Sequence, residues 1–311
     1  MKMNKIQKKL MAEVADLHSI PIGAYNFRIN GDLAGRNITT NINIQNREEG
    51  DGINVYIRDN TKNESVHIPV ILSNSGYKEK VYNDFYIGEN CDVLIVAGCG
   101  IDNCGNQDSQ HDGIHRFFIG KNSKIRYVEK HYGSGRGLGR KFFNPETVVH
   151  LAENSIAKME MIQLEGVDRT NRITRADLQR NAKLIVHECL LTSAEQRANS
   201  IYEVILNGDN SSAEVISRSV AKEKSYQKFE ARIVGNTRCR GHIECDSIIM
   251  DKGKILAIPS LEANDIDAEL IHEAAIGKIA TEQIIKLMSL GLTESEAVET
   301  IICGFLQNIH D

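Results

Sequence analysis

The feature that most limits the fold of this chain is a repeat in which an asparagine precedes a segment of alternating apolar and polar residues. Successive copies begin 26 to 32 residues apart, at Asn90, Asn122, Asn154, Asn181, Asn210 and Asn236. A repeat of this length made of strands and turns is typical of a β-solenoid, in which each unit makes one turn and stacks on the next. Asparagine suits the corners because it tolerates the left-handed backbone region, and parallel crossovers favour a right-handed coil. The repeat therefore predicts a mainly β protein built on a right-handed parallel β-helix.

A β-sandwich is the alternative for a chain rich in short strands. It would require tight Asn-Gly or Asp-Gly hairpin turns between neighbouring strands. Asn207-Gly208-Asp209 is one clear exception, and the pattern as a whole favours the β-helix.

Helical periodicity is confined to the two ends of the chain. Residues 5–17 place their apolar side chains on one stripe. Residues 268–309 predict two helices separated by Gly291, the second with Thr293 as N-cap and Glu296 at the capping-box position. Because a solenoid needs both ends covered, we expect three parts. These are an N-terminal helical cap at 1–20, a β-helix core at 21–265 and a C-terminal helical domain at 266–311.

Charge and hydropathy exclude several functional classes. The formal net charge of -5 argues against nucleic acid as the main partner, because phosphate binding requires a basic face. No apolar run is long enough for a membrane span, and the N-terminal residues are too polar for a signal peptide. Seven irregularly spaced cysteines then indicate reduced thiols rather than a disulfide framework. We therefore expect a cytoplasmic protein.

Ionisable and soft side chains are densest in residues 241–279. On a strand, His242 and Glu244 would share one face while Cys245 points to the other. Cys245 would then need co-ligands from elsewhere, and His272 and Glu273, which interrupt an apolar run, are the obvious source. Thiolate, imidazole and carboxylate are all metal ligands. The competing interpretations are a buried structural cysteine and a carboxylate that satisfies free N–H groups at a helix start.

The segment HDGIH is a second candidate metal site. His111 and His115 would form a metal-binding pair on a helix, and Cys99 and Cys104 precede them. A strand, which the β-helix implies, would break that geometry. A solenoid metallohydrolase using these two histidines is the alternative from the enzyme class.

The glycine-rich stretch 131–140 resembles a nucleotide-binding loop only superficially. It lacks both the dinucleotide-binding spacing and the phosphate-loop signature. We interpret it as a turn between coils, and we do not expect the chain itself to hydrolyse ATP.

Four ordered blocks in residues 205–308 resemble the core domain of the SufB/SufD family of the SUF iron–sulfur cluster assembly system. They read NGDNSSAEVISRSVAKEKSYQKFEARIVGN, CRGHIECDSIIMD, IPSLEANDIDAELIHEAAIGKI and GLTESEAVETIICGF. The N-terminal half resembles the family through AGCGIDN, HDGIH and VEKHYG. The family fold, a right-handed parallel β-helix with a helical C-terminal domain, agrees with the repeat.

The resemblance implies a SufB-like scaffold for iron–sulfur cluster assembly and transfer that is not an enzyme by itself. The cysteine of the family's CDS context falls on Cys245, and its HEA motif falls on His272 and Glu273. These three are the expected ligands of a transient [2Fe–2S] or [4Fe–4S] cluster, because imidazole and carboxylate hold iron less firmly than thiolate does. The acidic residue that often precedes the HEA motif is replaced by Ile271. For the sulfur-accepting cysteine, the candidates are Cys99 and Cys189.

The resemblance also implies partners. A SufC-type ABC ATPase would dock on the C-terminal helices, and a sulfur donor and apo-protein acceptors would bind in turn. The chain is shorter than SufB and resembles a compact type in which one subunit replaces both SufB and SufD, so a homodimer through the β-helix follows from twofold closure. The alternative is a SufD-like structural partner that holds no cluster. A flavin is suggested for larger family complexes, but no motif in this sequence supports one.

Overall fold

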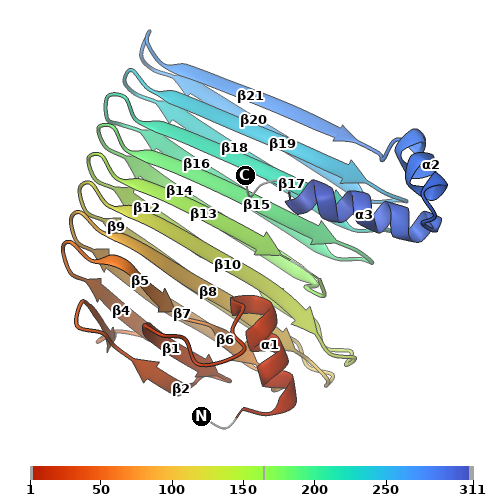
Figure 1. Cartoon of the computed structure of the whole chain (residues 1–311), viewed down its shortest axis with the longest axis horizontal. Coiled ribbons are helices and arrows are strands. Elements are labelled where there is room, and N and C mark those ends of the chain that lie inside the picture. The colour runs from red at the N-terminus through yellow and green to blue at the C-terminus, as the bar shows by residue number, and fades with distance from the viewer. Residues whose placement is uncertain (1–2, 164, 308–311) are drawn as a thin grey trace.

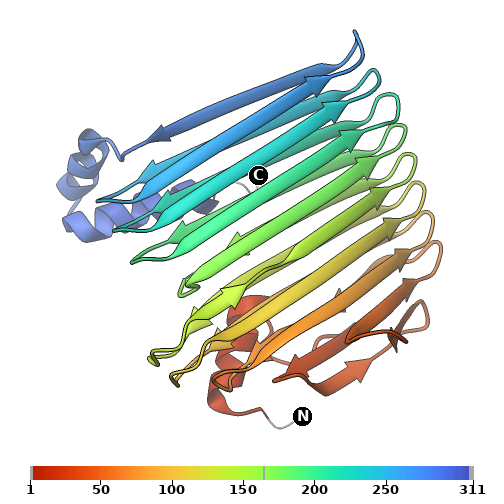
Figure 2. The same cartoon turned by 180° about the vertical axis from the view of Figure 1, so that it is seen from behind.

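The computed structural model describes residues 3–163 and 165–307. These residues form a β-solenoid of about eight turns, with one helix near the N-terminus and two near the C-terminus (Figure 1). Each turn contributes strands to two long sheets, and consecutive turns stack in chain order when seen from the front and from behind (Figures 1 and 2). Strands of successive turns pair in parallel. The predicted β-helix is therefore confirmed over the β-sandwich.

We call the two sheets sheet A and sheet B. Sheet A has the order β2-β1-β5-β8-β10-β13-β15-β17-β19-β21, with β6 paired to β1 and β8. Its strands are β1 (Ala24–Ile29), β2 (Asp32–Asn37), β5 (Lys62–His67), β6 (Val70–Leu72), β8 (Asp92–Asp102), β10 (Lys124–Ser134), β13 (Ile156–Gln163), β15 (Lys183–Thr192), β17 (Ser212–Ala221), β19 (Arg240–Ile249) and β21 (Glu269–Gly277).

Sheet B has the order β20-β18-β16-β14-β11-β9-β7-β4-β3, with β12 paired to β9 and β14. Its strands are β3 (Ile42–Asn46), β4 (Gly52–Ile57), β7 (Lys78–Ile87), β9 (Ser109–Ile119), β11 (Lys141–Phe143), β12 (Glu146–Leu151), β14 (Arg169–Leu178), β16 (Arg197–Leu206), β18 (Tyr226–Gly235) and β20 (Lys254–Ala263).

Side chains alternate between the interior and the outer surface along each strand, as the pleat requires. In β15, for example, Leu184 and Val186 point inward and are fully buried, while Ile185 and His187 point outward. The inward residues of successive turns join into one continuous apolar core between the sheets. Only the inward-facing residues of each strand can therefore contribute to clusters of polar side chains inside the solenoid.

A ladder of asparagine side chains marks one corner of the solenoid. Asn90, Asn122, Asn154, Asn181 and Asn210 have φ between 55° and 59°, the left-handed region predicted for them. Each side-chain amide donates to the side-chain oxygen of the previous asparagine, over 3.2, 3.0, 2.8 and 3.3 Å in chain order. The five corners are thus both shaped and hydrogen-bonded by the same residue type.

The sixth predicted corner residue does not belong to this ladder. Asn236 donates to Asn207 over 2.8 Å and accepts from Asn264 over 2.8 Å, and its φ is not positive. Arg238 takes the place next to Asn210. The sequence pattern was therefore wrong by one corner in the last repeat, because a second asparagine ladder runs beside the first.

The helices cover a side of the solenoid and not its ends, which corrects the predicted caps. Helix α1 (Lys5–Ala15) packs on the outer face of β8 and β10. A Cβ on Gly98 of β8 would lie 2.1 Å from the carbonyl oxygen of Val14, so this close approach requires glycine. The N-terminal end of the solenoid is instead formed by β2 and β3, which pair antiparallel with β1 and β4.

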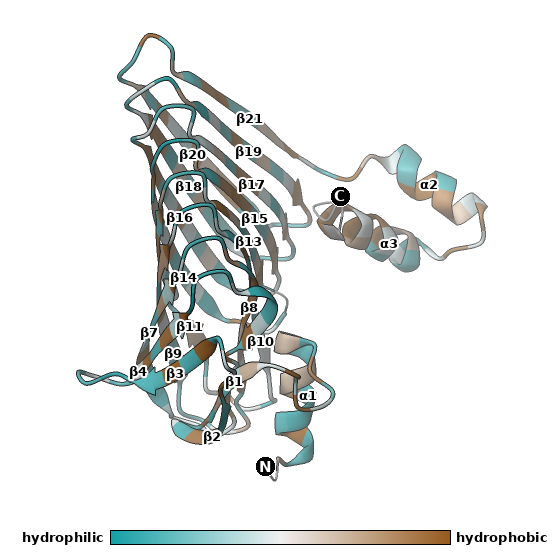
Figure 3. Ribbon diagram, turned by 60° about the vertical axis from the view of Figure 1, so that its left-hand side comes forward, coloured by the Kyte–Doolittle hydropathy of each residue, from teal (hydrophilic) through white to brown (hydrophobic). Residues whose placement is uncertain are grey.

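The C-terminal helical region begins later than predicted. Residues Glu269–Gly277 form strand β21, and helix α2 (Thr281–Ser289) begins fifteen residues after the expected boundary at 266. Helix α3 (Glu294–Gln307) contacts β17, on the same side of the solenoid as α1, while α2 projects away from the body (Figure 3). The capping box of α3 is confirmed, since the amide of Thr293 donates to the Glu296 carboxylate over 2.8 Å. Residues 1–2 and 308–311 of the two predicted terminal parts lie outside the described residues.

As a result, β20 and β21 are the outermost strands of their sheets in the described chain. The inward-facing residues of β20 are only partly buried, unlike those of the preceding turns. We call this the open end of the solenoid. At this end both sheets finish in edge strands, which present backbone N–H and C=O groups that another strand could pair with.

Within the glycine-rich stretch 131–140, residues 131–134 are the end of β10, and only residues 135–140 form the predicted turn between coils. A Cβ on Gly135 would lie 2.3 Å from the carbonyl oxygen of Asn103, and one on Gly137 would lie 2.2 Å from that of Gly105. Glycines are therefore needed here because two successive loops stack backbone against backbone.

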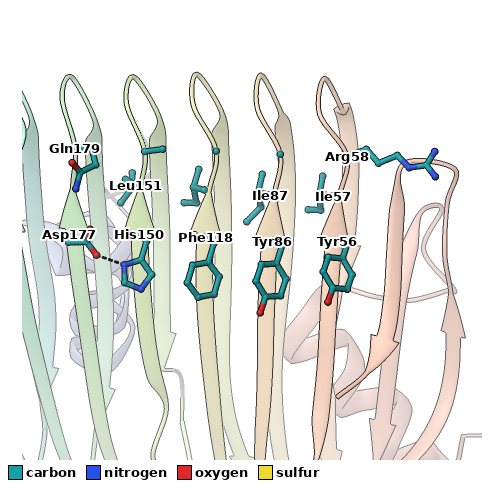
Figure 4. Close-up of a pocket in the computed structure, with 14 residues that line it drawn as sticks. Tyr56, Ile57, Arg58, Tyr86, Ile87, Phe118, His150, Leu151, Asp177 and Gln179 are labelled. Atoms are coloured by element: carbon teal, nitrogen blue, oxygen red, sulfur yellow. Dashed lines mark hydrogen bonds and ion pairs between the residues drawn. The ribbon is translucent and has the colours of Figure 1, made fainter. Parts of the chain in front are cut away.

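The outer face of sheet B carries a ladder of stacked rings (Figure 4). Tyr56, Tyr86, Phe118 and His150 stack with centroids 5.0, 5.1 and 5.1 Å apart. His150 is also hydrogen-bonded to Asp177 of the following turn. Because each ring covers a face of its neighbour, solvent meets mainly ring edges, and the ladder ties successive turns together.

Candidate functional site

The predicted site residues near the C-terminus lie on the last two strands of sheet A. β19 and β21 pair in parallel, with Ile243 opposite His272, Glu244 opposite Glu273 and Cys245 opposite Ala274. Paired residues of neighbouring strands point to the same face. Cys245 and His272 therefore share the inward face as diagonal neighbours, whereas Glu273 lies with Glu244 on the outer face.

Cys245 and His272 differ sharply in exposure. Cys245 is 2% exposed and belongs to the core, while His272 is exposed because no further turn covers the inner face of β21. Burial raises the pKa of the Cys245 thiol to about 11, and a contact with Ser247 Oγ at 3.8 Å offsets this only in part. A thiol of this kind is protonated at neutral pH and becomes a ligand when a metal displaces its proton.

The outer face of the same strand pair holds the acidic residues. Burial and the nearby Asp246 raise the pKa of Glu244, whose carboxylate lies 3.8 Å from Arg218. His242 also points outward, opposite Ile271, so it is separated from Cys245 by the sheet. Within residues 3–163 and 165–307, no three His, Cys, Asp or Glu residues are grouped so that they could hold a metal.

The second predicted cluster lies inside the solenoid. Cys99 of β8 and His111 of β9 come from opposite sheets, and their side chains meet in the interior together with His131 of β10. His111 Nδ1 bonds to Glu79 Oε1 at 2.9 Å, and Glu79 is also paired with Arg28 at 3.1 Å. All of these groups except Arg28 are buried.

This arrangement favours a thiolate beside an imidazolium. Burial alone would raise the pKa of Cys99, but His111 and His131 outweigh it, so the pKa is lowered. Burial alone would lower the pKa of His111, but Cys99 and Glu79 outweigh it and raise the pKa to about 10. Cys99 is thus the activated cysteine of the interior.

His115 belongs to the same interior but not to the same pair. As predicted for a strand, HDGIH does not form a helical two-histidine site: both rings point inward from β9, on either side of Gly113. Burial lowers the pKa of His115 to about 4, so its ring is neutral. Neither ring nitrogen has a hydrogen-bond partner among the described residues.

Cys189 is not part of this cluster. It points outward from β15 into a cavity of about 590 Å³ beneath α3, where its Sγ lies 3.7 Å from the carbonyl oxygen of Leu306. Burial and the neighbouring Glu188 raise its pKa to about 12. Of the two candidate sulfur acceptors, only Cys99 has groups that stabilise a thiolate.

A family model matches residues 83–305, described as "SUF system FeS cluster assembly, SufBD core domain". The chain belongs to the SufBD family. Its SufBD relatives include an iron–sulfur cluster assembly SufBD family protein of Archaeoglobus fulgidus, 32% identical over 262 residues, which cover 82% of this chain and 69% of the relative. The iron–sulfur cluster assembly protein SufB of Bacillus subtilis is 34% identical over 227 residues, which cover 71% of this chain and 47% of the relative.

The match varies in how much of each relative it spans. A SufBD family protein of Pyrococcus horikoshii is 27% identical over 294 residues, covering 89% of this chain and 85% of the relative. In contrast, the chain spans only 57% of a SufBD family protein of Methanothermobacter thermautotrophicus. None of the helices in the described ranges combines the length and hydropathy that a membrane crossing needs.

In this SufBD chain, sequence reasoning missed a buried ionic network between the two cysteine sites. Glu129 of β10 pairs with Arg172 of β14, and Arg172 Nη2 lies 3.2 Å from His131 Nδ1. Further along, Glu188 accepts hydrogen bonds from Ser200, Tyr202 and Ser217 over 2.5, 2.9 and 2.7 Å. Ser217 pairs with Cys245 in the sheet. The sequence did contain one signal for this network. These polar residues occupy the strand positions at which the side chains point inward and are otherwise mostly apolar.

Proposed function

We propose that this SufBD protein is a cytoplasmic scaffold, and not itself an enzyme, on which an iron–sulfur cluster is assembled as cargo at the open end of the solenoid. The observation that carries the proposal is the pairing of β19 with β21, which puts Cys245 and His272 on one face of the outermost strands. A thiolate and an imidazole at an uncovered edge hold a cluster less firmly than four thiolates, which suits transfer to acceptor proteins.

A second copy would complete the ligand set. One chain supplies two side chains on the inner face, and a twofold axis at the open end would bring a second pair beside them. The edge carries exposed apolar residues that such a dimer would cover, with Ile271 57% and Ile276 43% exposed on β21 and Leu256 42% exposed on β20. Glu273 faces the other side, so as a proposed third ligand it requires β21 to reorient in the dimer.

The test is anaerobic reconstitution of the full chain with iron and sulfide. Cys245→Ser and His272→Ala should each lower bound iron, sulfide and visible absorbance. Two matched controls are His242→Ala, which removes a histidine from the outer face of the same strand pair, and Cys303→Ser, which removes an exposed thiol from α3. Equal cluster content in Cys245→Ser and the wild type would contradict the proposal.

The ATPase partner is proposed to dock on the two C-terminal helices. Helix α2 has no buried residue, and Ile285, Met288 and Leu290 are 58%, 42% and 74% exposed, which leaves an unpartnered apolar surface. Ile285→Glu together with Leu290→Glu should abolish co-purification with a SufC-type ABC ATPase while leaving the thermal unfolding of the isolated chain unchanged.

Cys99 is proposed as the cysteine that accepts sulfur from the donor protein. Its support is the thiolate-stabilising pair of His111 and His131, which Cys189 lacks. Cys99→Ser should prevent loading of the scaffold from a sulfur-donor protein yet permit reconstitution with free sulfide. Cys189→Ser is the control and should change neither.

A SufD-like structural role is the second candidate. It is favoured by the absence of any three-ligand group in the part of the chain that the structure describes. Reconstitution that fails for this chain alone and succeeds only with a separate B-type subunit would establish that role in place of the first.

A further inference from the structure

Arginines on the outer surface of the solenoid are commonly paired with a carboxylate on a neighbouring turn. Arg126 pairs with Glu160 at 2.9 Å, and Arg175 pairs with Glu146 and Glu203 at 2.9 Å each. Arg232 likewise pairs with Glu262. Such cross-strand pairs are the expected way to place arginine on a ladder, because like charges directly opposite each other are destabilising.

One row of the surface breaks this pattern. At the start of five successive sheet B strands, the residues that lie directly opposite one another and point outward are Phe142, Arg169, Arg197, Tyr226 and Lys254. Arg169 therefore faces Arg197 with no carboxylate between them. We call this row, together with the loop residues beside it, the basic groove.

The basic groove has a volume of about 1110 Å³ and is also lined by Arg140, Lys224 and Lys252. Its two carboxylates are already engaged, since Asp168 lies 3.2 Å from Lys141 and Glu195 lies 3.9 Å from Lys224. Arg140 is paired with Asp108 at 2.9 Å.

Four cations remain. Among the described residues, no carboxylate forms a salt bridge with the side chains of Arg169, Arg197, Lys252 or Lys254, all of which are exposed. A chain with a formal net charge of -5 thus gathers four unpaired cations in one groove. Their mutual repulsion is relieved by an anion with several charges, and not by a single carboxylate.

We propose that the basic groove is a binding site for an oligophosphate, a small molecule with two or three linked phosphates such as a nucleoside di- or triphosphate. Two guanidinium forks on adjacent strands can each donate bidentately to phosphate oxygens. Lys252 and Lys254 supply point charges two turns beyond Arg197, on the far side of Tyr226, where a longer chain of phosphates or a nucleotide would extend. The ring of Tyr226, between Arg197 and Lys254 in the row, offers a surface on which a nucleobase can stack.

The probes are pyrophosphate, tripolyphosphate, ADP and ATP, titrated without added metal into the full chain by calorimetry at physiological ionic strength. The wild type should bind tripolyphosphate saturably at one site. The double variant Arg169→Gln with Arg197→Gln should weaken this binding roughly tenfold or more, because two charge-assisted contacts are lost.

The matched control is Arg175→Gln with Arg232→Gln. It removes the same charge from the same outer face of β14 and β18, but from arginines that are already paired with carboxylates. It should change the affinity by less than about twofold. Since all four side chains are on the outer face, thermal unfolding shows whether each double variant is folded before its affinity is compared.

Tyr226→Leu separates the two sources of phosphate. If a base stacks on the ring, this variant should weaken the binding of ADP and ATP and leave the binding of tripolyphosphate unchanged. The site is supported whether a nucleotide or an inorganic oligophosphate is the tighter ligand. Absence of saturable binding in the wild type, or an equal loss in the two double variants, would overturn the proposal. A single-stranded oligonucleotide that binds far more tightly than tripolyphosphate would overturn it in favour of a nucleic-acid surface.

Discussion

Arg172 of β14 forms an ion pair with Glu129 of β10 inside the solenoid, so the two sheets are joined by charge as well as by apolar packing. Both side chains are almost fully buried, and the pKa of Glu129 is held well below its usual range because Arg172 and His131 outweigh the effect of burial. A buried pair of this kind contributes little net stability as a pair but is costly to break.

We therefore expect Glu129→Gln to lower the free energy of unfolding by about 3–5 kcal/mol, because it leaves the Arg172 charge buried without its partner. Replacing both residues at once, Glu129→Gln with Arg172→Met, should cost clearly less than Glu129→Gln alone. Urea unfolding of Glu129→Gln, of Arg172→Met and of the double variant measures this. A double variant that is less stable by the sum of the two single effects would show that the residues act independently.

His115 should make stability depend on pH in a defined window. Its pKa is lowered from 6.5 to about 4 by burial, so between these values the unfolded chain binds a proton that the folded chain does not. Stability from this source is therefore complete above pH 6.5 and is lost as the pH falls toward 4, by about 3 kcal/mol in total.

The variant His115→Phe removes this contribution and keeps a ring beside Phe85 and Tyr127. Unfolding free energies measured from pH 7 to pH 4 should fall less steeply for the variant than for the wild type. The same slope in both proteins would mean that His115 is solvated in the folded state.

The sequence predicted the solenoid because its signal is local and repeated. An asparagine at a fixed offset before each strand reports the corner conformation directly, and φ near 55–59° at Asn90 through Asn210 confirms it. Residues 269–277 were misassigned as helix because ELIHEAAIG combines small residues and good helix formers. There the pairing of β21 with β19 outweighs local propensity, as tertiary context often does.

Packing of the helices and the interior chemistry could not be predicted in the same way. Apolar stripes predict that a helix packs, but not whether it covers an end or a side. The meeting of Cys99 with His111 and His131 depends on which residues of three different strands face inward at the same height. That register is set by loop lengths between turns, which vary, and no single segment of sequence contains it.

Cys99 and Cys245 should lose their protons in different pH ranges. The pKa of Cys99 is lowered by His111 and His131, whereas burial raises that of Cys245 to about 11. In a pH titration of the native protein followed by ultraviolet thiolate absorbance, we expect the step with the lower midpoint to disappear in Cys99→Ser and to remain in Cys245→Ser. A loss in the second variant instead of the first would reverse the assignment of the activated thiol. Unfolding each variant in denaturant should abolish the difference, because the histidines act only in the folded interior.

The asparagine ladder gives a prediction that separates backbone conformation from hydrogen bonding. Asn154 has φ of 59° and bonds to Asn122 and Asn181, whereas Asn236 makes the same kind of ladder bonds without a positive φ. Alanine and glycine both remove the side-chain bonds, but only glycine adopts the left-handed region without cost. Asn154→Ala should therefore be less stable than Asn154→Gly by about 1 kcal/mol. At position 236 the order should reverse, since glycine there only adds freedom to the unfolded chain. Thermal and urea unfolding of the four variants measure both differences, and alanine ranking above glycine at position 154 would mean that the corner relaxes out of the left-handed conformation.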